Sequence, residues 1–263
     1  MQKVTSKDGT PIAYERSDDG PALILVGGAL SDRTGVASLV PLLAGRLTVF
    51  AYDRRGRGDS GDTPPYAVER EVDDIEALIG EAGGSAALFG HSSGAVLALE
   101  AAHRLPSVAR LALYEPPFLV DRSRSELPPD YGVKVSELLQ AGRRGDAVEH
   151  FMTVAVGVPA GVISQMRQSP MWPSLERNAH TLLYDRAVMG DTMEGKPLPA
   201  GRWRGATMPA LVMNGGASPK WFETAADQLA KTLPHAIRKI LAGQNHGADP
   251  AIIAPVLLEF FGA

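Results

Sequence analysis

Short apolar runs recur along this chain, and several of them end in glycine or an acidic residue. The first is PALILVGG at 21–28, whose central positions are all hydrophobic, as in a strand covered on both faces. Similar runs follow at 46–53, 85–90, 110–115, 210–215 and 236–242. Helical patterns lie between them, among them 69–80 with one apolar face and 94–104 with many alanines and leucines. This alternation predicts an α/β fold, with a mostly parallel sheet flanked by helices.

The two ends of the chain carry more local signals. Lys7-Asp8-Gly9-Thr10 separates two strand-like stretches, 3–6 and 11–16, and so predicts an antiparallel hairpin. Near the other end, Asp249-Pro250 has the form of a helix N-cap followed by proline at the first helical position. A final helix is therefore expected to begin there.

The alternation of strands and helices stops between 118 and 205. This segment has proline-rich joints and no convincing strand, whereas helical patterns appear at 134–142, 146–156 and 174–188. It is far longer than an ordinary connection between two elements. We therefore expect an α/β core made of 1–117 and 206–263, with 118–205 as an inserted helical cap.

Composition excludes several classes of function. The chain contains no cysteine, which excludes disulfides, thiolate nucleophiles and cysteine-ligated metals, and its histidines form no H-x-H or H-E-x-x-H cluster, so no metal is expected. A net charge of −4 argues against a nucleic-acid-binding surface. No segment has the apolar length of a signal peptide or a membrane span, which predicts a cytoplasmic protein without membrane contact. The expected partner is a small-molecule substrate, and a homodimer is left open.

The strongest chemical signal is GHSSG at 90–94, which fits G-x-S-x-G and lies between a short buried strand and an alanine-rich helix. Glycines at both ends allow a sharp turn that exposes the Ser92 side chain at the helix N-terminus. The backbone N–H of Ser93 then faces the same space. A second glycine motif, GRGDSG at 56–61, formally fits G-x-G-x-x-G, but Thr63-Pro64-Pro65 follows it where a dinucleotide site needs a helix, so we interpret it as a structural turn.

With these motifs the chain resembles the α/β-hydrolase superfamily over nearly its full length. LILVGGAL at 23–30 is similar to the family's oxyanion loop, with Gly27 where a histidine is common, and YDRRGRGDS at 52–60 is similar to its D-x-R-G-x-G-x-S loop. The resemblance implies an α/β-hydrolase fold with Ser92 as nucleophile and His246 as base. It also implies an oxyanion hole made of the backbone N–H groups of Ala29 and Ser93.

The acid that would complete this site is not at its usual place. Ser218 stands where the family keeps a catalytic aspartate, and serine cannot supply a negative charge. Glu115, however, ends the strand that follows the nucleophile's helix, and the C-terminal ends of parallel strands lie along one edge of a sheet. Some branches of the family, certain haloalkane dehalogenases among them, carry the acid at this earlier strand. We predict a Ser92–His246–Glu115 triad; the alternative for Glu115 is a residue at the hinge of the cap or a solvated glutamate.

Large apolar side chains in the cap suggest a pocket for an apolar group. The residues expected to line it are Gly28, His91, Phe118, Met152, Met171 and Trp172, with Met166 and Met189 as further apolar groups. Together with the triad, they predict a cofactor-free serine hydrolase that cleaves a small hydrophobic carboxylic ester or lactone through an acyl-enzyme. Two alternatives remain: the same triad used for C–C hydrolysis, acyl transfer or perhydrolysis, and a non-catalytic ligand-binding protein on this fold.

Overall fold

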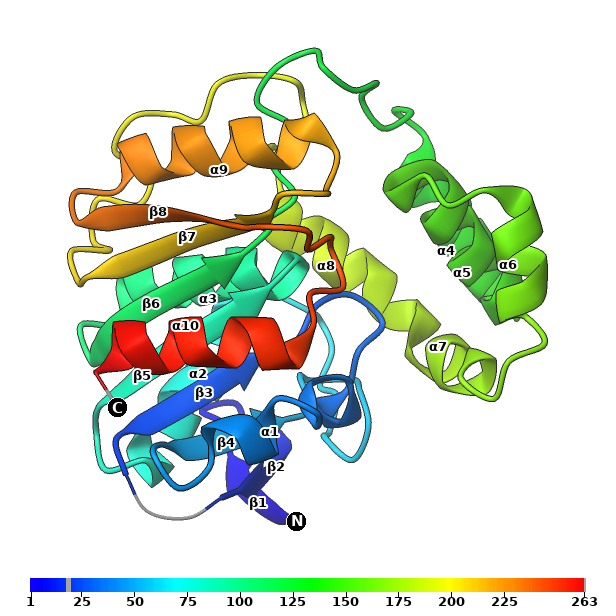
Figure 1. Cartoon of the computed structure of the whole chain (residues 1–263). Helices are drawn as coiled ribbons and strands as arrows, with labels where there is room; N and C mark the ends of the chain where they lie inside the picture. The colour runs from blue at the N-terminus through cyan, green and yellow to red at the C-terminus, as the bar shows by residue number, and fades with distance from the viewer. Residues whose placement is uncertain (18–19, 263) are drawn as a thin grey trace.

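A single eight-stranded sheet forms the centre of the computed structural model, which describes residues 1–17 and 20–262 (Figure 1). Its strands are β1 (Gln2–Thr5), β2 (Pro11–Arg16), β3 (Ala22–Val26), β4 (Thr48–Tyr52), β5 (Ala86–His91), β6 (Val108–Tyr114), β7 (Ala210–Gly215) and β8 (Ala236–Leu241). They follow the order β1-β2-β4-β3-β5-β6-β7-β8 across the sheet. All six apolar runs recognised in the sequence are strands of this sheet.

The strand directions agree with the sequence prediction. β1 and β2 form the predicted antiparallel hairpin, and β2 is also antiparallel to β4, whereas every pairing from β4 to β8 is parallel. Because the parallel strands point the same way, β5, β6, β7 and β8 deliver the residues that follow them to one edge of the sheet. Ser92, Glu115, Ser218 and His246 all come shortly after one of these strands.

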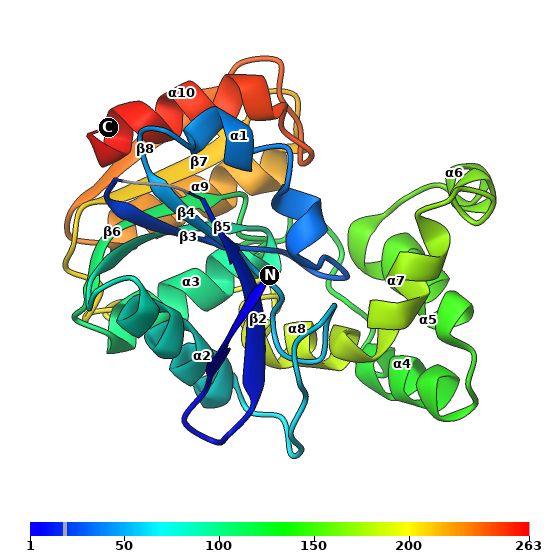
Figure 2. The same cartoon turned by 90° about the horizontal axis from the view of Figure 1, so that it is seen from below.

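Helices cover both faces of the sheet (Figures 1 and 2). Side chains of α2 (Val68–Glu81), α3 (Ser93–Arg104) and α9 (Lys220–Thr232) share one core cluster with residues of the sheet. Side chains of α1 (Val40–Leu43) and α10 (Pro250–Phe261) share a second cluster with the opposite face, and Asp249 caps α10 as predicted. None of the helices within 1–17 and 20–262 is long and apolar enough to cross a lipid bilayer.

The segment between β6 and β7 is helical, and most of it stands to one side of the sheet (Figure 2). Its helices are α4 (Tyr131–Gln140), α5 (Arg144–His150), α6 (Ala160–Met166), α7 (Trp172–Asn178) and α8 (Leu182–Met189), with a π-helical turn, η2 (Phe151–Val156), after α5. A third cluster joins α4 to α7 with Leu182 of α8 and Leu30 of the core, and α8 also contacts α2 and α3. The flanks of the segment also belong to the core, because Phe118, Val120 and Trp203 are buried against it.

Candidate active site

Ser92 occupies a sharp turn between β5 and α3. Its backbone lies at φ +57° and ψ −129°, a conformation that costs energy in any residue with a side chain. The turn also needs both neighbouring glycines: a Cβ at Gly94 would lie 2.3 Å from the carbonyl oxygen of Val26, and one at Gly90 would lie 2.5 Å from Cα of Ala95. The G-x-S-x-G pattern is thus used here to hold one serine in a strained, outward-facing position.

The buried Glu115 and the partly exposed His246 form a pair next to this turn. Nδ1 of His246 lies 2.7 Å from Oε2 of Glu115, and the backbone N–H of Gly215 donates to Oε1 at 2.8 Å. The Glu115 side chain is fully buried, so it is not the solvated glutamate of the alternative interpretation. Burial raises the pKa of Glu115, but the hydrogen bonds from His246 and Gly215, together with the nearby Ser218 hydroxyl, outweigh it and hold this pKa below its usual range. Glu115 is therefore ionised at neutral pH.

Ser218 lies next to the Glu115 carboxylate but does not supply the acid. Its hydroxyl contributes to the low pKa of Glu115, yet its oxygen has no well-aligned hydrogen bond to any residue within 1–17 and 20–262. The sheet explains the arrangement, because β6 and β7 are adjacent and parallel, with Tyr114 paired to Met213. The ends of these two strands bring Glu115 next to the position that Ser218 occupies.

His91 supports the loop that carries His246. Its Nε2 lies 2.8 Å from the backbone oxygen of His246, so this nitrogen carries the proton and donates. The hydroxyl of Tyr114 donates to the neighbouring carbonyl of Asn245 at 2.5 Å. Burial and the nearby His246 lower the pKa of His91 to about 4, which keeps its ring neutral. His91 therefore lies behind His246 instead of lining the pocket, where the sequence had suggested it.

A cavity of about 700 Å³ opens in front of Ser92 and His246. Ala29 and Ser93, the predicted oxyanion residues, also line it. Its apolar wall comes from the segment between β6 and β7 and from the start of α9, with Tyr131, Phe151, Leu182, Met189, Met193, Trp221 and Phe222 among the lining residues. Trp221 and Phe222 were not predicted; the only sequence signal for them is an aromatic pair directly after the turn at Ser218-Pro219.

Of the apolar groups predicted for the pocket, Met189 lines the cavity, and the other predicted pocket residues do not. Gly28, His91, Phe118, Met152, Met166, Met171 and Trp172 are all absent from the cavity lining. Phe118 is fully buried in the core, where it stacks on Trp203 with ring centroids 5.4 Å apart. Met171 points to solvent with 64% of its surface exposed. Trp172, Met152 and Met166 pack inside the cap, and Gly28 lies under the turn, where an added Cβ would be 3.1 Å from Cβ of Ser92.

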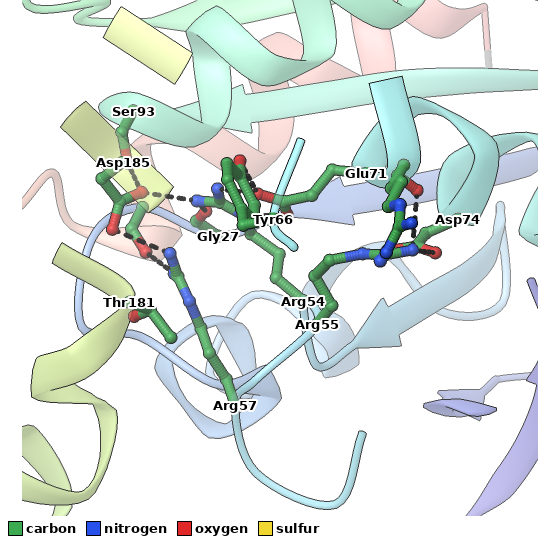
Figure 3. A network of polar contacts seen from close by, with 12 residues as sticks. Gly27, Arg54, Arg55, Arg57, Tyr66, Glu71, Asp74, Ser93, Thr181 and Asp185 are labelled. Carbon is green, nitrogen blue, oxygen red and sulfur yellow. Dashed lines mark hydrogen bonds and ion pairs between the residues drawn. The ribbon is translucent and has the colours of Figure 1, made fainter. Parts of the chain in front are cut away.

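A network of buried charges lies beneath the turn (Figure 3). Arg54 forms a bidentate pair with Glu71 at 2.8 and 2.7 Å and also donates to Asp185 on α8 at 2.8 Å. Arg57 donates to the other oxygen of Asp185 at 2.8 Å, and the Ser93 hydroxyl donates to Asp185 at 2.8 Å. All of these side chains are buried. The network was not predicted from the sequence, which had suggested only a structural turn at 56–61.

Arg57 also fixes the peptide group between Gly28 and Ala29. Its Nη1 donates to the Gly28 carbonyl at 2.6 Å. In a trans peptide the C=O and N–H groups point in opposite directions, so this contact turns the N–H of Ala29 away from Arg57. Ala29 lines the cavity on that side. Arg54 makes a longer contact of 3.3 Å with the Gly27 carbonyl, so two arginines hold this loop from behind.

Within the described residues no group of three or more His, Cys, Asp or Glu side chains could hold a metal ion. The arrangement consists instead of a serine on a strained turn, an imidazole bound by an ionised carboxylate, and backbone N–H groups beside one cavity. A doubly covered parallel sheet with this turn after its central strand defines the class of α/β hydrolases.

Comparison with known proteins supports this class. Residues 23–255 match the model of the alpha/beta hydrolase family, so the chain belongs to that family. The solved structure of an alpha/beta hydrolase from Sphaerobacter thermophilus is 56% identical and superimposes with a TM-score of 0.93, over 99% of this chain and 100% of that one.

Curated relatives are more distant. A probable oxidoreductase, EphD, of Mycobacterium tuberculosis is 40% identical over 83 residues, which are 30% of this chain and only 14% of that protein. The 2-(acetamidomethylene)succinate hydrolase of Mesorhizobium japonicum is 27% identical over 256 residues, which are 93% of this chain and 89% of that enzyme.

Proposed function

We propose that this alpha/beta hydrolase cleaves a small carboxylic ester or lactone through an acyl-enzyme on Ser92. The observation that carries the proposal is the 2.7 Å contact between the ionised Glu115 carboxylate and Nδ1 of His246, beside a strained serine in the same cavity. The contact leaves Nε2 of His246 as the ring nitrogen that is not bound to Glu115. This nitrogen is the base for the Ser92 hydroxyl.

Each step uses a group of the chain. Ser92 attacks the carbonyl carbon while His246 accepts its proton, and Glu115 stabilises the imidazolium that forms. The N–H groups of Ala29 and Ser93 donate to the oxygen that becomes negative. His246 then returns the proton to the leaving alcohol, and water, activated by the same imidazole, releases the acid. This sequence requires no cofactor.

The cavity supports a small substrate covered by the segment 118–205, which we propose as the cap. Aromatic side chains from its two sides, Phe151 and Phe222 among them, suit the apolar part of an acyl or alcohol group. The hydrolase named for its action on 2-(acetamidomethylene)succinate, which matches over most of its length, supports hydrolysis of a small molecule.

A fluorophosphonate probe tests the nucleophile. Folded protein should be labelled at Ser92, identified by mass spectrometry of the modified peptide, while Ser92→Ala protein should not be labelled. A Ser92 that stays unmodified in folded protein would favour a ligand-binding role without catalysis.

The reaction is tested with a substrate panel. Para-nitrophenyl esters of increasing chain length should be hydrolysed faster than a matched series of diketones. A strong preference for the diketones would instead assign C–C hydrolysis to the same triad, and transfer of the acyl group to an added alcohol would assign acyl transfer.

A further inference from the structure

Arg124 forms part of the cavity wall. It lies in the segment between β6 and α4, is half-buried, and places its guanidinium 5.1 Å from the centre of the Trp221 ring. Its Nη2 donates to the backbone carbonyls of Val154, at 3.4 Å, and Ala155. Its Nε and Nη1 have no hydrogen-bond acceptor within 1–17 and 20–262. The side chain is thus fixed in place but keeps donors free.

The charge of Arg124 is uncompensated. Among residues 1–17 and 20–262, no carboxylate lies within 4.0 Å of it. Two other carboxylates at the cavity are matched inside the protein: Asp185 is bound by Arg54 and Arg57, and Glu194 pairs with Lys196 at 2.9 Å. Arg122, Glu126 and Arg186 also line the cavity and form no ion pair within 1–17 and 20–262, but Arg124 is the cation that lies against the Trp221 ring. Burial lowers the pKa of Arg124, because the partly desolvated cation lacks an anion. An arriving carboxylate would offset this desolvation cost.

An aromatic wall connects Arg124 with the proposed catalytic base. The Phe222 ring stacks on His246 with centroids 5.0 Å apart, and Trp221 stacks on Phe222 at 3.7 Å. Trp221 in turn carries the guanidinium of Arg124. A substrate chain that lies along these rings has its reacting carbonyl at the Ser92 end and its far end at the cation.

We propose that Arg124 binds a carboxylate of the substrate, so that the preferred substrate is an ester or lactone with a free carboxylate at the end opposite the scissile bond. The inference rests on the function proposed above and narrows its substrate class to esters and lactones that carry a negative charge. A planar guanidinium suits this role because two of its N–H groups can meet two carboxylate oxygens.

Two matched esters test the inference. The para-nitrophenyl hemiester of glutaric acid and para-nitrophenyl pentanoate share leaving group and chain length, but only the first carries a carboxylate. The protein should show a higher kcat/KM for the hemiester. Arg124→Gln should reduce this preference by about 10- to 100-fold, the usual effect of losing a hydrogen-bonded charge, and leave kcat/KM for the pentanoate within about twofold.

Two further variants separate binding from general electrostatics. Arg124→Lys should keep part of the preference, because it keeps the charge. Arg143→Gln, which removes an exposed cation of the cap that pairs with Asp146, should leave it unchanged. Equal loss of activity on both esters in Arg124→Gln, or no preference in the unaltered protein, would overturn the inference.

If neither ester is hydrolysed, calorimetric titration of Ser92→Ala protein with glutarate still tests whether Arg124 binds a carboxylate. Glutarate should bind, and the added Arg124→Gln substitution should weaken binding by a similar factor. If neither ester is hydrolysed but glutarate binds in an Arg124-dependent way, the proposed reaction is rejected and the anion site is retained. If Arg124→Gln leaves glutarate binding unchanged, the anion site is rejected.

Discussion

Glu115 binds the imidazole of His246 at 2.7 Å, although 131 positions separate the two residues in the chain. The contact depends on the sheet: Glu115 follows β6, the loop after β8 carries His246, and β7 lies between these strands. Gly215 at the end of β7 donates to the same carboxylate and so fixes it from the middle strand. The end of β7 therefore holds the carboxylate of Glu115 in place.

Glu115→Gln should lower kcat for an ester by about 10³- to 10⁴-fold, because an amide neither stabilises the imidazolium nor fixes the correct tautomer of His246. The Gln carbonyl can still accept from Gly215, so the melting temperature should change little. Steady-state kinetics and a thermal melt on the same preparation check both parts. A fully active variant would show that Glu115 is not the acid.

Ser218→Ala should be mild. The hydroxyl has no well-aligned hydrogen bond within 1–17 and 20–262, so its removal leaves no partner unsatisfied. We expect kcat within a few-fold of the unaltered protein and an unfolding free energy within about 1 kcal/mol. A loss of activity as large as that of Glu115→Gln would instead give Ser218 a direct role in catalysis.

His91 should make the protein sensitive to mild acid. Its pKa is lowered to about 4 in the folded state, so the unfolded chain binds the extra proton between about pH 6.5 and pH 4. Stability should therefore fall as the pH decreases through this window. His91→Gln keeps an N–H donor for the His246 carbonyl but cannot titrate. Urea denaturation gives the free energy of unfolding at pH 7 and at pH 5. The decrease between the two pH values should be smaller by about 2 kcal/mol in His91→Gln than in the unaltered protein. Equal losses would show that His91 does not titrate in this range.

Asp185→Asn should affect both stability and catalysis. Removing one partner of a buried ion pair typically costs about 3 kcal/mol or more, and Arg57 then loses the only carboxylate with which it pairs among residues 1–17 and 20–262. The Gly28–Ala29 peptide then loses part of its support, so we expect kcat to fall by about 10- to 100-fold with little change in KM.

Asp146→Asn is the matched control for Asp185→Asn. Asp146 also pairs with two arginines, Arg143 and Arg167, but on the exposed surface of the cap, where such pairs contribute about 1 kcal/mol or less. Kinetics measured well below the melting temperature of each variant separate the loss of kcat from the loss of stability. A stable Asp185→Asn protein with unchanged kcat would show that the network does not position the Ala29 N–H.

The strands and the main site residues could be predicted because each leaves a local pattern. Buried parallel strands are continuous apolar runs, and G-x-S-x-G marks the Ser92 turn. Glu115 was found by a simple geometric argument, since adjacent parallel strands end at the same edge. These features depend on the chain within a few residues or on one rule of sheet topology.

The pocket could not be predicted because it depends on how the cap helices turn toward the core. Met171 and Trp172 are neighbours in sequence, yet one points to solvent and the other into the cap. An apolar composition does not distinguish between these faces. The buried charge network was equally hidden. Arg54 and Arg57 have the sequence of a solvated loop, and their partner Asp185 lies more than 120 positions away.

Asp185 joins one helix of the segment 118–205 to the core. It lies on α8, and its partners Arg54, Arg57 and Ser93 all belong to the core. The helices α4 to α7 pack mainly on one another and make none of these contacts. Replacing α4 to α7 would therefore leave the contacts of Asp185 with the core in place. Chimeric proteins joined just before α8 should retain hydrolysis and inherit the specificity of the donor.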